Sequence, residues 1–212
     1  SQKSLWARLH RFCRASQRPL SERLLIWSSY FTDARSILRP DFPLAPRDSI
    51  FRREDHAGSP LQKLLRINFQ DYLPNDLHVK LDRCSMAHGL ETRSPFLDTR
   101  LIEWSFSLPD RFKLRAGATK WLLRRAFQEE LPREILTRGK MGFGVPLEDW
   151  FRGPWKGPLH DLLAVGQPRV LRYLRSEALK GLLLRHQRGQ EDAGQRLWLL
   201  LTLEVWLRSL VS

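Results

Sequence analysis

The sequence predicts a mainly α-helical protein. Its 212 residues suit one domain or a large piece of one, and 42% of them are hydrophobic, including 8 Trp and 11 Phe, which is enough to form a core. Apolar residues recur at helical spacing in several segments, whereas only "RFKLR" (111–115) indicates a strand. Because strands and helices do not alternate along the sequence, we expect no complete parallel α/β sheet within it.

Residues 1–38 are predicted to form a helical lead-in. "LSERLLIWSSYF" (20–31) carries leucine and aromatic residues at helical spacing, and "TDARSILRPDF" is expected to continue this helix and to stop near Pro40. The next part, 39–60, is predicted to be an exposed connection because it is rich in helix-breaking residues, namely Pro40, Pro43, Pro46, Gly58 and Pro60.

Residues 61–138 are predicted to form a helical core. The clearest helix is expected over 71–91, where one stripe recurs every three or four residues: Leu73, Leu77, Leu81, Cys84 and Ala87/His88. Pro74 suits the first turn of that helix, and Gly89 suits its exit. Further helices are expected near 98–107 and from Thr119, as the N-cap, to just before Pro132, with one or two more turns after it.

The last two parts are a loop and a helical end. Residues 139–158 are rich in glycine and proline and are predicted to be a loop that carries Lys140. Residues 159–212 are predicted to hold the C-terminal helices, near 174–187 and 195–210.

Composition excludes several classes of protein. The apolar run 197–207 is interrupted by Thr202 and Glu204 and is shorter than the roughly 20 residues of a membrane span. The basic N-terminal stretch lacks the apolar segment of a secretory signal. Two cysteines, Cys13 and Cys84, make neither a disulfide framework nor a metal site, so we expect a cytoplasmic protein.

The net charge of +13 does not by itself indicate nucleic-acid binding. The 36 basic residues comprise 28 Arg and 8 Lys, and they are spread along the chain rather than gathered into a basic block. Binding through phosphate contacts alone would be weak and sensitive to salt. Specific nucleic-acid binding is therefore not expected.

Lys140 is the first candidate catalytic residue. It lies in "RGKMGFG" (138–144), where glycines allow the backbone to approach a ligand closely. Its compact ammonium suits a phosphate or a developing oxyanion, but these residue types alone favour a solvated loop cation. No glycine-rich phosphate loop occurs in the sequence to decide between the two.

A second group of polar residues lies in "MAHGLETRSPFLD" (86–98). Glu91, Arg93 and Asp98 fall within eight residues at a predicted helix exit. They either brace a loop through ion pairs or form one wall of an active site, with Arg93 facing an anion. His88 ends the apolar stripe, which favours a core or interface histidine over a ligand, and no cluster has the spacing of a metal site.

Three blocks of the sequence resemble the C-terminal part of the synthetase domain of glutamine-hydrolysing asparagine synthetases. They are "YLPNDLHVKLDRCSMAHGLETRSPFLDTRLIEWSFSLPDRFKLR", "TKWLLRRAFQEELPREILTRGKMGFGVPLEDWFRG" and "RLWLLLTLEVWL", in that order. "LSERLLIWSSYFT" fits the family's preceding segment, so the resemblance runs from about residue 20 to the end. β-Lactam synthetases and lasso-peptide cyclases share this scaffold.

The resemblance implies a chemistry for the chain. Such enzymes use ATP and Mg²⁺ to adenylate the side-chain carboxylate of aspartate, and ammonia released from glutamine then attacks the acyl-adenylate. By position, Lys140 matches the family's lysine near the reacting groups. Glu91, Arg93, Asp98 and Lys120 lie in family-typical blocks and are expected at most in the active-site wall, without an assigned role. The resemblance also allows a homodimer.

The sequence departs from the family by what it lacks. Neither the Ser-Gly-Gly-x-Asp-Ser pyrophosphate loop nor the later Ser-Gly-(Glu/Asp)-Gly-x-Asp-Glu stretch occurs, and residue 1 is Ser rather than the nucleophilic cysteine of a glutaminase domain. We therefore expect the helical C-terminal portion of an adenine-nucleotide alpha-hydrolase-like (PP-loop ATPase) synthetase domain, with the parallel sheet upstream. The alternatives are a related amide- or lactam-forming synthetase and an inert helical binding module.

Overall fold

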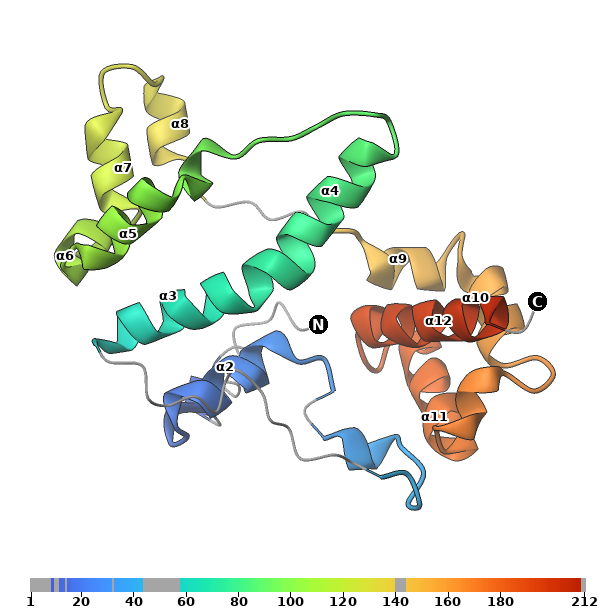
Figure 1. Cartoon of the computed structure of the whole chain (residues 1–212). Coiled ribbons are helices and arrows are strands. Elements are labelled where there is room, and N and C mark those ends of the chain that lie inside the picture. The colour runs from blue at the N-terminus through green and yellow to red at the C-terminus, as the bar shows by residue number, and fades with distance from the viewer. Residues whose placement is uncertain are drawn as a thin grey trace. The chain divides into compact units, whose positions relative to one another are not determined.

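The computed structural model describes residues 9, 12–13, 15–31, 33–43, 58–139 and 144–210 (Figure 1). The chain divides into two compact units: the first comprises Ser1–Arg47 with Phe143–Ser212, and the second comprises Asp48–Gly142. Most described residues of both units are helical, which confirms the prediction of a mainly α protein. No described helix combines the length and the apolar character that a membrane crossing requires.

The first unit is built around its C-terminal helices. Helix α12 contacts α9, α10 and the short helix η5, and α11 contacts α9. The elements are α2 (Leu20–Ser28), η1 (Ala34–Ser36), α9 (Leu147–Arg152), α10 (Lys156–Leu163), η5 (Arg169–Arg172), α11 (Ser176–Gln187) and α12 (Gly194–Ser209). The two C-terminal helices thus lie within two residues of their predicted ranges.

One hydrophobic core joins these helices. Leu159, Val170 and Leu197 are fully buried, and Phe151 is almost so. Burial of side chains of this size stabilises by about 1.5–3 kcal/mol each relative to leaving them exposed. The segment after η1 joins the same core through Ile37.

Backbone pairing holds this segment against the chain before α11. Leu38 and Leu174 form an isolated antiparallel bridge, with the Arg39 amide donating to the Tyr173 carbonyl at 2.8 Å. The Arg175 amide donates to the Ile37 carbonyl at 2.9 Å.

A buried carboxylate links α12 to η5. Glu204 has no solvent exposure, and its Oε2 accepts the backbone amide of Val170 at 2.9 Å. Its other oxygen accepts Nε of Arg208, one turn later, at 2.7 Å. Arg169 reinforces the same junction by donating to the Leu207 carbonyl at 2.6 Å, near the end of α12. A buried acid is expected to be paired and hydrogen-bonded in this way.

His186, near the end of α11, is the second buried polar residue of the first unit. Its Nδ1 accepts the amide of Ala193 at 3.2 Å, which places the proton of the neutral ring on Nε2. Nε2 is buried and has no partner among the described residues. Burial lowers the pKa of His186, and the nearby Arg152 charge lowers it further, while the backbone of Glu191 and the charges of Asp192 and Glu148 oppose the shift.

We expect the first unit to lose stability as the pH falls below about 6.5, the ordinary pKa of histidine. The unfolded chain then binds a proton that folded His186 does not, so the free energy of unfolding falls by up to about 1.4 kcal/mol per pH unit. Urea unfolding between about pH 7.5 and 5.5, above the range where carboxylates titrate, measures this slope. His186→Gln keeps an acceptor for Ala193 but does not titrate, so an equally steep slope in that variant would contradict the prediction.

The second unit consists of short helices and one hairpin. Its elements are α3 (Pro60–Gln70), the π-helix η3 (Leu73–His78), α4 (Val79–Met86), η4 (Pro95–Leu97), α5 (Thr99–Ser107), α6 (Asp110–Lys113), β1 (Leu114–Arg115), β2 (Ala118–Thr119), α7 (Trp121–Ala126) and α8 (Arg133–Thr137). A capping box between Ser59 and Gln62 starts α3, and Lys113 donates to the Leu108 carbonyl at 2.8 Å just after α5.

The predicted strand is present only at its end. Of residues 111–115, the first three belong to α6 and the last two form β1, which pairs with β2 in an antiparallel hairpin. The turn residues Ala116 and Gly117 have φ of 49° and 80°. Two successive positive φ values are typical of the type I′ turn that favours tight hairpins.

Several predicted boundaries were wrong. The segment after α2 does not continue it but forms the separate turn η1, because the Asp33 side chain accepts the Arg35 amide and starts a new helical turn. Thr119 lies in β2 rather than at a helix N-cap, and α7 begins after it, at Trp121, and ends at Ala126. Within 139–158, expected as a loop, Leu147–Arg152 form α9 directly after Pro146.

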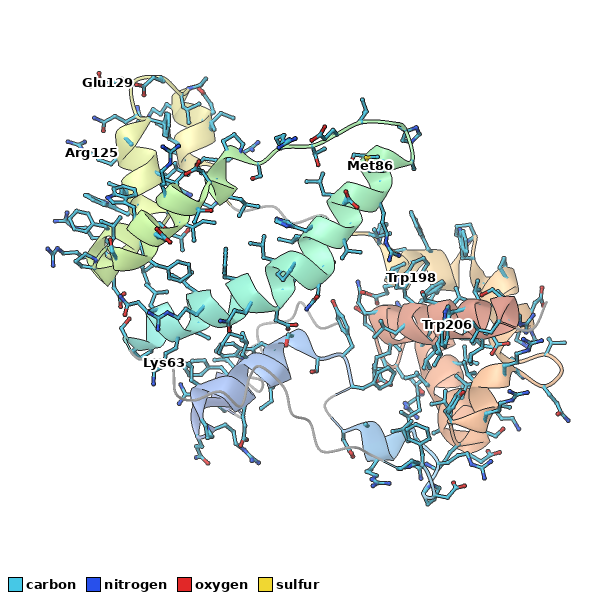
Figure 2. All side chains as sticks on the ribbon, in the orientation of Figure 1. Lys63, Met86, Arg125, Glu129, Trp198 and Trp206 are labelled. Carbon is cyan, nitrogen blue, oxygen red and sulfur yellow. The ribbon has the colours of Figure 1, made fainter. Side chains whose placement is uncertain are left out.

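The helix expected over 71–91 is divided and ends early. It passes through the π-helix η3, which contains Pro74, before α4 ends at Met86 (Figures 1 and 2). Proline lacks an amide proton, so the ordinary α-helical hydrogen bond cannot form at that position. The predicted apolar stripe is not buried among the described residues: Leu81 is 50% exposed, and Cys84 and His88 are also exposed. His88 is therefore not a core histidine in this structure.

Candidate functional site

The candidate catalytic residue, Lys140, lies outside the described residues, together with 141–143. Its role therefore stays a prediction. Residues on both sides of this short segment are described, one side in each unit. They show how each end of the segment is anchored.

Helix α8 anchors the N-terminal end within the second unit. Nη1 of Arg124, on α7, donates to the Leu136 carbonyl at 2.6 Å, which ties α8 to α7. Thr137 donates its hydroxyl to the Arg133 carbonyl at 2.9 Å. Gly139 follows, and a side chain at this position would meet nothing within 4 Å. A Cβ at Gly139 would thus point into open space.

Helix α9 anchors the C-terminal end within the first unit. Leu147 and Phe151 bury its apolar face in the core. Gly194, at the start of α12, approaches the backbone of α9 so closely that a Cβ there would lie 2.8 Å from the Glu148 nitrogen. Because backbone atoms cannot move aside as a flexible side chain can, only glycine fits at this crossing.

Arg152 fixes α9 to two other segments. Its Nη1 donates to Glu148 Oε1 on the same helix at 2.5 Å, and its Nε donates to the His186 carbonyl at 2.8 Å. Its Nη2 donates to the Glu191 carbonyl at 3.1 Å. The side chain is 27% exposed, so these charge-assisted hydrogen bonds are partly shielded from water. Sequence analysis missed this residue, although the Glu148–Arg152 spacing of four was visible.

The other predicted site residues belong to the second unit, and only two of them meet. Arg93 Nη2 forms an ion pair with Glu91 Oε1, but both side chains are largely exposed. Exposed pairs contribute about 0–1 kcal/mol. Asp98 instead caps α5, where its Oδ1 accepts the Arg100 amide at 3.0 Å. The hydrogen bond from the Arg100 side chain lowers the pKa of Asp98.

Lys120 has an unusual backbone. It lies between β2 and α7 with φ of 56° and ψ of 35°, in the left-handed region that non-glycine residues seldom adopt. The chain passes from the β1–β2 hairpin into α7 at this residue. In the described part of the second unit, no hydrogen bond or ion pair joins Lys120 to Glu91, Arg93 or Asp98. The place of these four residues in an active-site wall therefore stays a prediction.

Metal ligands are also not grouped in the described residues. No set of three or more His, Cys, Asp or Glu side chains there could hold a metal ion.

Comparisons with known proteins identify the family. A family model described as asparagine synthase matches residues 1–208. The chain is 27% identical over 193 residues to asparagine synthetase [glutamine-hydrolyzing] 1 of Bacillus subtilis, covering 89% of this chain and 30% of that protein. It is 30% identical over 196 residues to a putative asparagine synthetase [glutamine-hydrolyzing] of Mycobacterium bovis, covering 86% of this chain and 30% of the relative.

A shorter region is more similar still. Over 80 residues, 34% of this chain and 14% of the relative, the chain is 44% identical to asparagine synthetase [glutamine-hydrolyzing] of Gallus gallus. No solved structure matches at a significant level. The chain thus spans less than a third of the length of these curated relatives. Because the family model matches nearly the whole chain, the chain belongs to the asparagine synthase family.

Proposed function

We propose that this chain is the C-terminal helical part of an enzyme that makes asparagine from aspartate, with ATP as the activating substrate and glutamine as the nitrogen source. The observation that supports this most directly is the family match over residues 1–208, together with relatives named glutamine-hydrolysing asparagine synthetases. In this proposal the chain is one part of a PP-loop ATPase synthetase domain whose parallel sheet and pyrophosphate loop lie upstream, and the enzyme works in the cytoplasm.

Lys140 has a defined task in this reaction. A carboxylate is a poor electrophile because it is negatively charged and its leaving group would be oxide, and adenylation removes both obstacles. Negative charge then grows on the phosphates and on the tetrahedral oxyanion. A cation held near these atoms, away from water, stabilises that charge.

ATP and Mg²⁺ are assigned mainly to residues upstream of this chain. The sequence contains no pyrophosphate loop, and the described residues hold no group of three or more His, Cys, Asp or Glu side chains suited to a metal ion. Glu91, Arg93, Asp98 and Lys120 remain candidates for the active-site wall, without a chemical role.

The proposed function is tested in the full-length protein that contains this chain. We expect it to form asparagine from aspartate, ATP and glutamine, and to release pyrophosphate in equal amount. A product that forms from another acid, with no activity on aspartate, would instead assign the protein to a related amide- or lactam-forming synthetase.

The isolated 212-residue chain is expected neither to bind ATP tightly nor to exchange pyrophosphate. The reason is that backbone amides of a glycine-rich loop provide most of the binding to phosphates, and no such loop occurs in the sequence. ATP–pyrophosphate exchange in the presence of aspartate measures this directly. Clear turnover by the isolated chain would show that it carries its own nucleotide site and would refute the assignment to an upstream loop.

A further inference from the structure

The first unit contains a cavity that is lined by charged and apolar side chains. It has a volume of about 360 Å³, within the range of small-molecule sites, and it opens between the η1 region and helices α11 and α12. Its larger apolar lining residues, here called the hydrophobic wall, are Phe31, Ile37 and Leu182. Three arginines also line it, namely Arg175, Arg185 and Arg196.

Two of these arginines already hold an anion of the chain itself. Nε of Arg185 donates to Glu191 Oε2 at 2.9 Å, and Arg196 donates to the other oxygen of the same carboxylate. Burial raises the pKa of Glu191, but the hydrogen bonds from the two arginines outweigh this effect, and the pKa lies below its ordinary value. The pair of guanidinium groups is therefore placed to recognise a planar anion from two directions.

Positive charge around the cavity exceeds what Glu191 neutralises. Among the described residues Arg175 pairs with no acid, and its Nη2 donates there to the backbone carbonyls of Arg35 and Ser36. Glu177 also lines the cavity, but its side chain is 88% exposed and faces Lys180 at 3.5 Å. A lining that combines several arginines with apolar side chains is suited to a ligand with one charged end and one apolar end.

We propose that this cavity binds a small organic anion, with its carboxylate or phosphate group beside the arginines and its apolar part against the hydrophobic wall. Glu191 competes with the ligand for Arg185 and Arg196, because one carboxylate occupies donors that the ligand also needs. This competition gives the site a distinctive signature. Loss of either arginine weakens binding, whereas neutralisation of Glu191 strengthens it.

Binding of benzoate to the whole 212-residue chain, measured by ligand-observed NMR at physiological salt, tests the site. We expect a Kd on the order of a millimolar, as for a fragment of that size. Uncharged benzyl alcohol is expected to bind at least tenfold more weakly, since it cannot accept charge-assisted hydrogen bonds. Competition by inorganic phosphate would assign the site to phosphate groups, and its absence would assign it to carboxylates.

Four variants separate this site from general attraction to a basic protein. Arg196→Gln and Arg185→Gln should each weaken benzoate binding by about tenfold. Glu191→Gln should tighten it. Arg188→Gln, an exposed arginine of the same region without a side-chain partner among the described residues, should leave it unchanged. Circular dichroism verifies that each variant folds. The Arg185→Gln and Arg196→Gln variants are two independent tests of the same predicted loss of binding.

The proposal fails if no binding is detected at a benzoate concentration of about 10 times the expected Kd. It also fails if Arg188→Gln weakens binding as much as Arg196→Gln does, because the charge of the whole protein would then explain the effect. Weaker binding by folded Glu191→Gln would likewise overturn it. Activity of the synthetase plays no part in these measurements, so their outcome is independent of the proposed function.

Discussion

Lys140→Ala is expected to lower the rate of asparagine formation by roughly 10²–10³-fold in the full-length enzyme, the scale for loss of one preorganised group that stabilises charge in the transition state. The fold should survive, because a lysine in a glycine-rich segment buries little apolar area. Steady-state kinetics with aspartate, ATP and glutamine measure the effect. Lys140→Arg should restore little activity, since the planar guanidinium of arginine does not replace the compact ammonium of lysine.

Two controls make this result specific to Lys140. Lys156→Ala removes an exposed lysine from the start of α10, in a helix that the site does not include, and should leave the rate unchanged. Glutamine hydrolysis, assigned to a separate domain, should persist in the Lys140 variants. A folded Lys140→Ala enzyme that forms asparagine within about twofold of the unchanged protein would identify Lys140 as a solvated loop cation.

Helices with a clear apolar period were predictable from the sequence, but their ends often were not. The sequence placed α5, α11 and α12 within a few residues of their observed ranges. Boundaries failed where a local side-chain or backbone preference overrides that period. The Asp33 cap at η1 and the hairpin before α7 are two such cases.

The stripe over 73–88 shows a different limit of sequence reasoning. Its apolar spacing correctly indicated a helical segment, yet Leu81 is 50% exposed and the residues around it are exposed as well. Periodicity shows which residues share a face, but it does not show what covers that face. α12 gives a similar lesson, since Trp198 and Trp206 project from it (Figure 2) and are 42% and 54% exposed.

For the candidate site, residue types gave the chemistry but not the anchoring. The sequence singled out Lys140 because of its glycine neighbours. It could not show that Gly194, more than 50 positions away, lies against the backbone of α9, because that contact depends on tertiary packing. The sequence also could not show that Arg152 contacts the carbonyls of His186 and Glu191, since residue types do not indicate which backbone carbonyl accepts a hydrogen bond.

Glu204→Ala is expected to destabilise the first unit by about 3 kcal/mol. The substitution leaves the Val170 amide without its acceptor in the core and opens a small cavity, two effects that each contribute about 1–3 kcal/mol. Arg208 contributes less to this loss, because its side chain is 43% exposed and water can solvate it. Urea unfolding at pH 7 measures the change in the free energy of unfolding.

Asp161→Ala, which removes an acid that is 75% exposed on α10, is the matched control and should change the free energy of unfolding by less than about 0.5 kcal/mol. Glu204→Gln keeps an acceptor for Val170 and should lie between the two. If Glu204→Ala unfolds at the same urea concentration as Asp161→Ala, the buried carboxylate does not stabilise the junction of α12 and η5.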